Sequence, residues 1–215
     1  NHLPALQVVI PLLLAPVAIL VSLPFLSWLV ALFGSLFCLY ASVSLFFQVS
    51  EFGKINYFMG GWLPPYGIEY VIDEASSFMI VLISLMGVFA TIFAYQSLKK
   101  EINEKSQSKV YGMWLLALGG LLGLVTTGDA FNLFVFLEIS SLSSVTLVAL
   151  GSKKDKRALT AAFNYLLIGA VGATFYVIGV GLLYSVTGTL NIADLTIKIS
   201  ELTANNSVKA GISFI

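Results

Sequence analysis

The chain has 215 residues, of which 58% are hydrophobic and 10% are charged, and its mean hydropathy is +0.95. A soluble domain carries about 25% charged residues to cover its surface, so this composition indicates an integral membrane protein. The eleven basic and eleven acidic residues balance, which gives no indication of a nucleic acid or polyanionic partner. The single cysteine, Cys38, and the single histidine, His2, provide neither a disulfide framework nor a metal site.

Six apolar stretches are long enough to cross a membrane, because about 20 apolar residues span the ~30 Å of hydrocarbon. One run, residues 110–150, is twice that length. It must break at residues 126–129, where Gly128 ends one helix and Asp129 caps the next. The sequence therefore predicts an all-α polytopic membrane protein with spans at residues 3–23, 25–47, 75–98, 110–126, 130–150 and 159–186.

Three polar segments connect these spans. Residues 48–74 form a long loop rich in glycine and proline, with Asp73 placed to cap the third span. Residues 99–109 and 187–207 form two more hydrophilic loops. An apolar stretch at residues 208–215 then begins a seventh helix, so we expect the native polypeptide to continue beyond Ile215.

The distribution of basic residues predicts the orientation. Eight of the eleven lie in the connections between spans three and four and between spans five and six: Lys99, Lys100, Lys105, Lys109, Lys153, Lys154, Lys156 and Arg157. Both connections emerge on the same side if the spans alternate. The positive-inside rule places this side in the cytoplasm, so we expect the N-terminus and the loop at residues 48–74 to lie outside.

Glu138 differs from the other acidic residues, which lie in loops or at span ends. It lies eight residues into the fifth span, about 12 Å along a helix, near the middle of the bilayer. An ionisable group at that depth costs at least ~2.5 kcal/mol and normally faces the interior of the bundle with a partner. We therefore predict Glu138 as a proton or cation site; the alternative is a protonated glutamate in a static interhelical hydrogen bond.

Ser141 lies one turn further along the same helical face and is a weaker candidate for the same site. The neighbouring hydroxyls at Ser140, Ser143, Ser144 and Thr146 fit helix packing better. Asn164 and Tyr165 in the sixth span are candidates to extend a polar path, although hydrogen-bonded packing accounts for them better. We identify no catalytic residue, metal-ligand cluster, nucleophile constellation or phosphate-binding loop, and expect no cofactor.

Residues 128–140, with the sequence GDAFNLFVFLEIS, resemble the fifth-helix motif of antiporter-like proteins. The family occurs in Mrp sodium/proton antiporters (the Mrp D protein), membrane-bound hydrogenases and the proton-pumping arm of NADH dehydrogenase (complex I). Three more stretches share the resemblance: GWLPPYGI at 61–68, KRAL at 156–159 followed by AA at 161–162, and TGTLN at 187–191 with Asp194. The resemblance covers essentially the whole chain.

The resemblance implies an inverted-repeat fold with broken helices. In this interpretation residues 1–98 form three N-terminal helices with an outward loop at 48–74, and residues 110–215 begin the first antiporter-like repeat. Glu138 matches a glutamate that modulates a lysine on the seventh helix. Lys209 lies too near the start of that helix to be this lysine, so the partner is expected beyond Ile215.

The leading hypothesis is a subunit that translocates protons, sodium ions or both within a larger complex in a prokaryotic plasma membrane. Its partners would be other membrane subunits, and any redox chemistry would belong to them. The alternative is a structural subunit that anchors partners and moves no ion. A self-sufficient small-solute carrier is less favoured, because the chain has no second repeat.

Overall fold

The computed structural model describes residues 2–21, 23–151, 155–202 and 206–215. Within these residues, six helices are long and apolar enough to cross a membrane. The polytopic helical fold predicted from the sequence is therefore confirmed. The six helices are α1 (Leu3–Leu20), α2 (Pro24–Phe52), α3 (Glu74–Glu101), α4 (Glu104–Thr126), α5 (Ala130–Leu150) and α6 (Arg157–Thr187).

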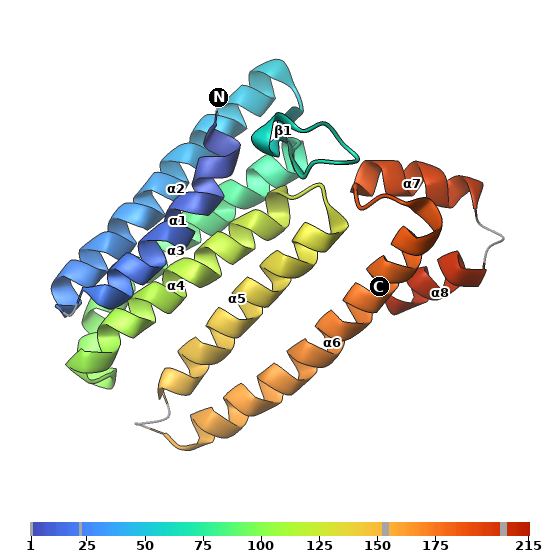
Figure 1. Ribbon diagram of the computed structural model, residues 1–215. Helices are drawn as coiled ribbons and strands as arrows, with labels where there is room; N and C mark the ends of the chain where they lie inside the picture. Colours follow the sequence, from blue (N-terminus) through green and yellow to red (C-terminus); the bar gives the residue numbers. More distant parts are fainter. Residues whose placement is uncertain (1, 22, 152–154, 203–205) are drawn as a thin grey trace.

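Helices α1 to α4 form a bundle in which α4 packs against each of the other three (Figure 1). Glycines on two faces of α4 allow its close approach to its neighbours. A Cβ at Gly112 would lie 2.9 Å from the carbonyl oxygen of Ala15 on α1, and one at Gly120 would lie 2.9 Å from the backbone nitrogen of Ser140 on α5. Small residues commonly permit such contacts between membrane helices, and α4 is the most buried of the six spans.

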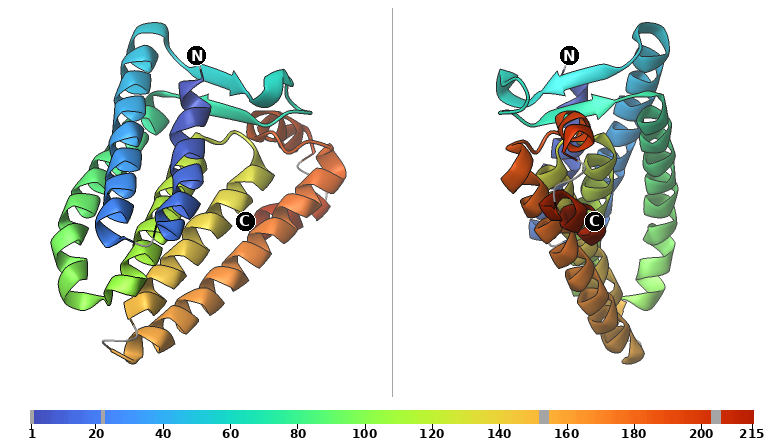
Figure 2. Two further views of the ribbon diagram at one scale, coloured as in Figure 1. Left: turned by 60° about the vertical axis from the view of Figure 1, so that its left-hand side comes forward. Right: turned by 90° about the vertical axis from the view of Figure 1, so that its right-hand side faces the viewer.

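Helices α5 and α6 extend the bundle to one side, with α5 against α4 and α6 against α5 (Figures 1 and 2). Two short helices, α7 (Ile192–Glu201) and α8 (Asn206–Phe214), follow α6. They pack with it around the buried residues Val180, Leu183, Leu195 and Val208, next to Ala130 at the start of α5. The described part of α8 is too short to cross a membrane, so the expected seventh span stays a prediction.

The connection between α2 and α3 contains a β-hairpin that the sequence did not reveal. Strand β1 (Ile55–Phe58) pairs antiparallel with β2 (Glu69–Ile72), and a short 3₁₀ helix, η1 (Met59–Gly61), follows β1. Gly60 and Gly61 both have positive φ angles, which glycine adopts without a steric penalty. We call this end of the molecule the hairpin end (Figure 2).

The expected loop at residues 99–109 is almost entirely helical, because α3 continues to Glu101 and α4 begins at Glu104. Polar residues at a membrane surface can extend a helix when its terminal backbone groups find partners. Here the Gln107 side chain donates to the carbonyl oxygens of Leu98 and Ile102, at 3.3 and 3.0 Å. The expected loop at residues 187–207 likewise contains helix α7.

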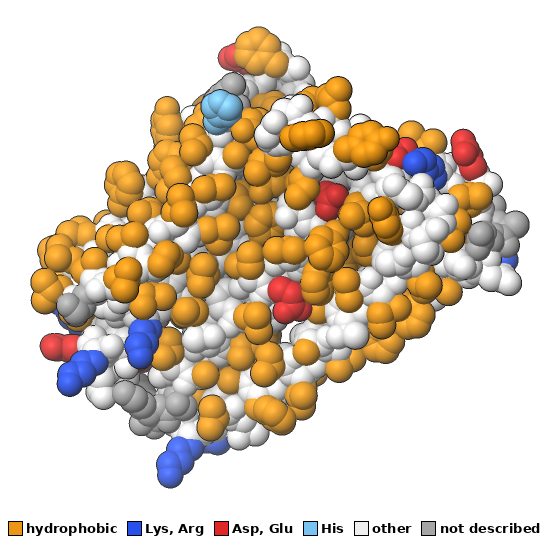
Figure 3. All heavy atoms as spheres, viewed as in Figure 1, with side chains coloured by type: hydrophobic (Ala, Val, Ile, Leu, Met, Phe, Trp, Pro, Cys, Tyr) orange, Lys and Arg blue, Asp and Glu red, His pale blue; other side chains and the backbone are white. Residues whose placement is uncertain are grey.

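Basic side chains gather at the end opposite the hairpin, while hydrophobic side chains cover most of the face shown in Figure 3. We call this end, which carries the α3–α4 and α5–α6 connections, the basic end. Its described basic residues are Lys99, Lys100, Lys105, Lys109, Lys156 and Arg157. The even number of spans between Lys99 and Lys156 accounts for their common side.

The charge distribution predicts that the basic end faces the cytoplasm. Asn103, between α3 and α4, and Asn56, on β1, are exposed, whereas Cys38 is buried. A cysteine at Asn103 should react with a membrane-impermeant maleimide in inside-out vesicles, and one at Asn56 in right-side-out vesicles. The protein without either new cysteine is the control. Labelling of both positions from the same side would contradict the span assignment.

Candidate functional site

Glu138 lines a cavity of about 350 Å³ between α5 and α6. Its side chain is half-buried, and the structure shows no hydrogen bond or ion pair to its carboxylate from any described residue. The other lining residues come from the facing surfaces of α5 and α6, with Leu121 from α4: Leu121, Leu137, Ser140, Ser141, Ser144, Tyr165, Ile168, Gly169, Gly172, Ala173 and Tyr176.

Ser141 shares this cavity with Glu138, as their spacing of one helical turn predicts. A Cβ at Gly169 would lie 3.0 Å from the Ser141 hydroxyl oxygen, so the hydroxyl reaches the backbone of α6. The structure thus brings the two candidate residues together on the face of α5 that is turned toward α6. Their role in ion translocation stays a prediction.

The remaining polar candidates divide into two groups. Tyr165 lines the cavity, whereas Asn164 is exposed and does not. Ser140 and Ser144 also line it, but each hydroxyl donates to a carbonyl oxygen of its own helix, at 3.0 and 2.7 Å. Among the residues that the structure describes, no group of three or more His, Cys, Asp or Glu residues is arranged to hold a metal ion.

The α4–α5 connection lies between strand β2 and the α6–α7 connection, and hydrogen bonds join all three segments. The Gly128 nitrogen donates to the Glu69 carbonyl oxygen at 2.9 Å, and the Ile192 nitrogen donates to the Gly128 carbonyl oxygen at 2.9 Å. The Ala130 nitrogen donates to the Leu190 carbonyl oxygen at 2.8 Å. We call these three contacts, together with the Glu69–Asn191 side-chain bond described next, the linker ladder.

The linker ladder contains a buried carboxylate. Glu69 and Asn191 are 7% and 4% exposed, and the Asn191 side-chain nitrogen donates to a carboxylate oxygen of Glu69 at 2.8 Å. A buried charge is stable only when hydrogen bonds replace its hydration. Asn191 supplies one such bond across 122 positions of sequence, and no local pattern in the sequence reveals this contact.

Gly128 is required for a reason other than the one expected. The sequence predicts a helix-terminating glycine at this position, yet its φ angle is not positive. A Cβ here would instead lie 2.7 Å from a methyl group of Val71 and 3.1 Å from the side chain of Glu69. Gly128 is therefore the residue that lets strand β2 approach the α4–α5 connection.

The two connections share one local motif. The Thr127 hydroxyl accepts a hydrogen bond from the Asp129 nitrogen at 3.3 Å, and the Thr189 hydroxyl accepts one from the Asn191 nitrogen at 3.3 Å. Each Asx side chain then caps the following helix: Asp129 accepts from Asn132, and Asn191 accepts from Asp194. The predicted cap at Asp129 is thus confirmed, as is the cap at Asp73, which accepts from Ser76.

Asp129 is almost fully buried, at 7% exposed. Burial raises the pKa of its carboxyl group above the ordinary value, while hydrogen bonds from the backbone nitrogens of Asn132 and Phe131 oppose this rise. The helix N-terminus at which it lies also favours a negative charge. These contacts account for Asp129 as a cap that fixes where α5 begins.

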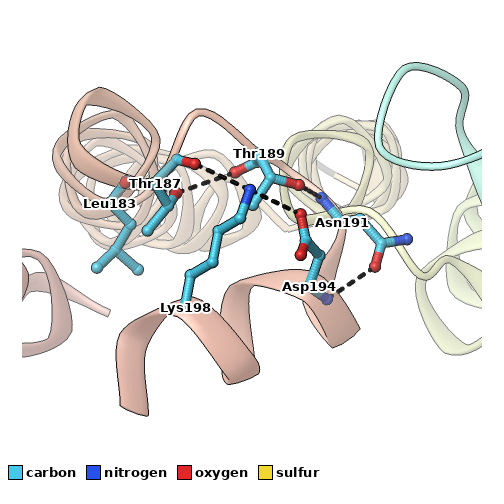
Figure 4. A network of polar contacts seen from close by, with 6 residues as sticks. All are labelled: Leu183, Thr187, Thr189, Asn191, Asp194 and Lys198. Atoms are coloured by element: carbon cyan, nitrogen blue, oxygen red, sulfur yellow. Dashed lines mark hydrogen bonds and ion pairs between the residues drawn. The ribbon is translucent and has the colours of Figure 1, made fainter. Parts of the chain in front are cut away.

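Lys198 fixes the turn between α6 and α7 (Figure 4). Its ammonium group lies 3.1 Å from the Asp194 carboxylate and donates to the carbonyl oxygen of Thr187, the last residue of α6, at 3.1 Å. A cation at a helix C-terminus satisfies an otherwise unpaired carbonyl group and complements the helix dipole. Gly188, with φ of 68°, then allows the chain to leave the helix.

Asn191 has two roles that substitutions can separate. Asn191→Ala removes both the cap of α7 and the partner of Glu69, and should lower the free energy of unfolding by about 1–3 kcal/mol. Asn191→Asp retains a capping oxygen but places a carboxylate beside Glu69, and should also destabilise the protein. Thermal unfolding in detergent measures both changes. Asn56→Ala, at an exposed position, is the control; equal stability of the Asn191 variants and this control would contradict the role of the linker ladder.

A family model described as "NADH:quinone oxidoreductase/Mrp antiporter, TM" matches residues 127–215. NADH-quinone oxidoreductase subunit N of Desulforudis audaxviator is 40% identical over 217 residues, covering 100% of this chain and 42% of that protein. The D protein of the Na(+)/H(+) antiporter of Alkalihalophilus pseudofirmus is 33% identical over 203 residues, covering 94% of this chain and 40% of that protein.

Two solved structures share the fold over the whole chain. A chain of the membrane-bound sulfane sulfur reductase, an archaeal respiratory membrane complex, superposes with a TM-score of 0.90 and 30% identity, and 43% of it is covered. A chain of the Mrp complex from Dietzia superposes with a TM-score of 0.83 and 26% identity, and 40% of it is covered. This chain thus spans about two fifths of its curated relatives. It belongs to the family of antiporter-like membrane subunits found in NADH:quinone oxidoreductases and Mrp antiporters.

Proposed function

We propose that this chain is part of an ion-translocating subunit in which Glu138 takes up and releases a proton. The observation that supports this most directly is the half-buried carboxylate of Glu138 in a cavity between two membrane spans. A carboxyl group at this depth is unfavourable unless it serves a site or finds a partner. Ser141 provides a second polar group in the same cavity, suited to hold a water molecule beside the carboxylate.

A cation that approaches and leaves Glu138 would lower and raise the pKa of its carboxyl group in turn. Lys209 does not serve this purpose, because it is exposed on α8 and does not line the cavity. We propose that the cation belongs to a lysine on a helix beyond Ile215. On the same view, residues 110–215 begin the first of two inverted repeats, and residues 1–98 form the preceding three-helix unit.

Relatives of this chain are named for Na(+)/H(+) antiport and for NADH-quinone oxidoreduction, and the related structures belong to large membrane complexes. We therefore place the subunit in a multi-subunit complex of a prokaryotic plasma membrane, with the N-terminus outside. Protons are the proposed ions, with sodium in exchange as a second candidate that the name of the antiporter relatives favours. The linker ladder also fits the alternative of a structural subunit, in which Glu138 would be a static hydrogen-bonding group.

Substitution of Glu138 separates these two functions. Glu138→Gln keeps the volume and hydrogen-bonding capacity but removes titration, so an ion-translocating subunit should lose most of its flux. Glu138→Asp retains titration with a shorter reach and should keep part of the flux. The measurement is proton or sodium flux in proteoliposomes that contain the complete complex, with assembly checked on native gels. Wild-type flux in Glu138→Gln would refute the proton site and favour the structural subunit.

A further inference from the structure

The cavity around Glu138 has different surroundings toward the two ends of the molecule. Toward the hairpin end it is bounded by Tyr176, whose hydroxyl donates to the carbonyl oxygen of Ala130 at 3.1 Å. Ala130 is the first residue of α5, so this bond ties the middle of α6 to the N-terminus of α5. It is a side-chain contact between the two helices beside Glu138.

Apolar side chains fill the space beyond Tyr176. The tyrosine ring packs against the buried cluster that α5, α6, α7 and α8 form near the hairpin end. All the buried members of this cluster lack a polar side-chain atom: Ala130, Val180, Leu183, Leu195 and Val208. An apolar cluster of this kind offers no hydrogen-bonding partner to water or to an ion, so Tyr176 is the last polar side chain on the cavity wall in this direction.

Toward the basic end the space between α5 and α6 continues. Ser141, Ser144 and Tyr165 line the Glu138 cavity on this side. A second cavity, of about 440 Å³, follows between the same two helices and includes Val145 on α5 and Thr160 on α6. The α5–α6 interface is therefore hollow from Glu138 toward the basic end and filled from Tyr176 toward the hairpin end.

We propose that Tyr176 is a barrier and positioning residue for Glu138. Its ring closes the cavity toward the hairpin end, and its hydroxyl holds α6 against the start of α5 so that the closure persists. The importance of this closure for transport rests on the proposed function of Glu138, because a site that exchanges ions must not be open to both sides at once. The closure itself is a property of the packing and can be measured without any flux.

Cysteine accessibility tests the barrier. Ser141→Cys places a thiol in the cavity, in the complete protein with its other cysteines replaced, including Cys38. A membrane-impermeant cationic methanethiosulfonate reagent is applied to sealed vesicles of either orientation. With Tyr176 present, the thiol should react from the basic-end side and remain protected from the hairpin-end side.

Tyr176→Ala should raise the reaction rate from the hairpin-end side by about tenfold, because one hydrogen bond and a ring contact no longer hold the closed form. Tyr176→Phe keeps the ring and should raise it less, so the order Ala, Phe, wild type separates closure from general loosening. Tyr184→Ala is the matched control, since Tyr184 lies on the same helix but is exposed and does not line the cavity. If Tyr176→Ala fails to assemble, Tyr176→Leu replaces it, with the same prediction.

Hairpin-side reaction of Ser141→Cys in the presence of Tyr176 would overturn the proposal. So would hairpin-side rates in the assembled Tyr176 variants equal to that of Tyr184→Ala. Neither result depends on the flux of Glu138→Gln. A functional Glu138→Gln protein with an intact barrier would refute the proton site alone, and a one-sided cavity that survives Tyr176→Ala or Tyr176→Leu would refute the barrier alone.

Discussion

Backbone groups outside helices need hydrogen-bond partners near a membrane, and the arrangement of α5 and α6 depends on how this chain provides them. The α4–α5 and α6–α7 connections are both non-helical at the hairpin end. Strand β2 and the two connections exchange backbone hydrogen bonds through Glu69, Gly128 and Leu190. Each connection also ends in a residue, Asp129 or Asn191, that caps the following helix. The positions at which α5 and α7 begin are thereby fixed relative to the hairpin.

That constraint determines the surroundings of Glu138. Because α5 begins at Ala130 and α6 is tied to that residue through Tyr176, the face of α5 that carries Glu138 is turned toward α6. On the opposite side, Gly120 and Gly123 of α4 admit Ser140 and the ring of Phe136 at close range. The acidic side chain therefore lies beside a cavity bordered by small and hydroxylated residues, rather than in a closely packed apolar interface.

The sequence predicted those features that follow from local rules. Span lengths follow from membrane thickness, and the caps at Asp73 and Asp129 follow from side-chain chemistry at helix starts. The shared face of Glu138 and Ser141 follows from helical periodicity. The hairpin, the Glu69–Asn191 bond and the contact between Tyr176 and Ala130 were not predicted, because each depends on segments that are not neighbours in the sequence. The predicted reason for Gly128 was wrong, since its close neighbour, β2, is distant in sequence.

The central claim is that Glu138 changes its protonation state during the work of the complex. Infrared difference spectroscopy of the reconstituted complex, recorded across a pH titration with ¹³C-labelled glutamate, reports this most directly. A carboxylic C=O stretching band should shift on labelling, change with pH and be absent from Glu138→Gln while present in Glu69→Gln. A wild-type difference spectrum that Glu138→Gln leaves unchanged would contradict the claim.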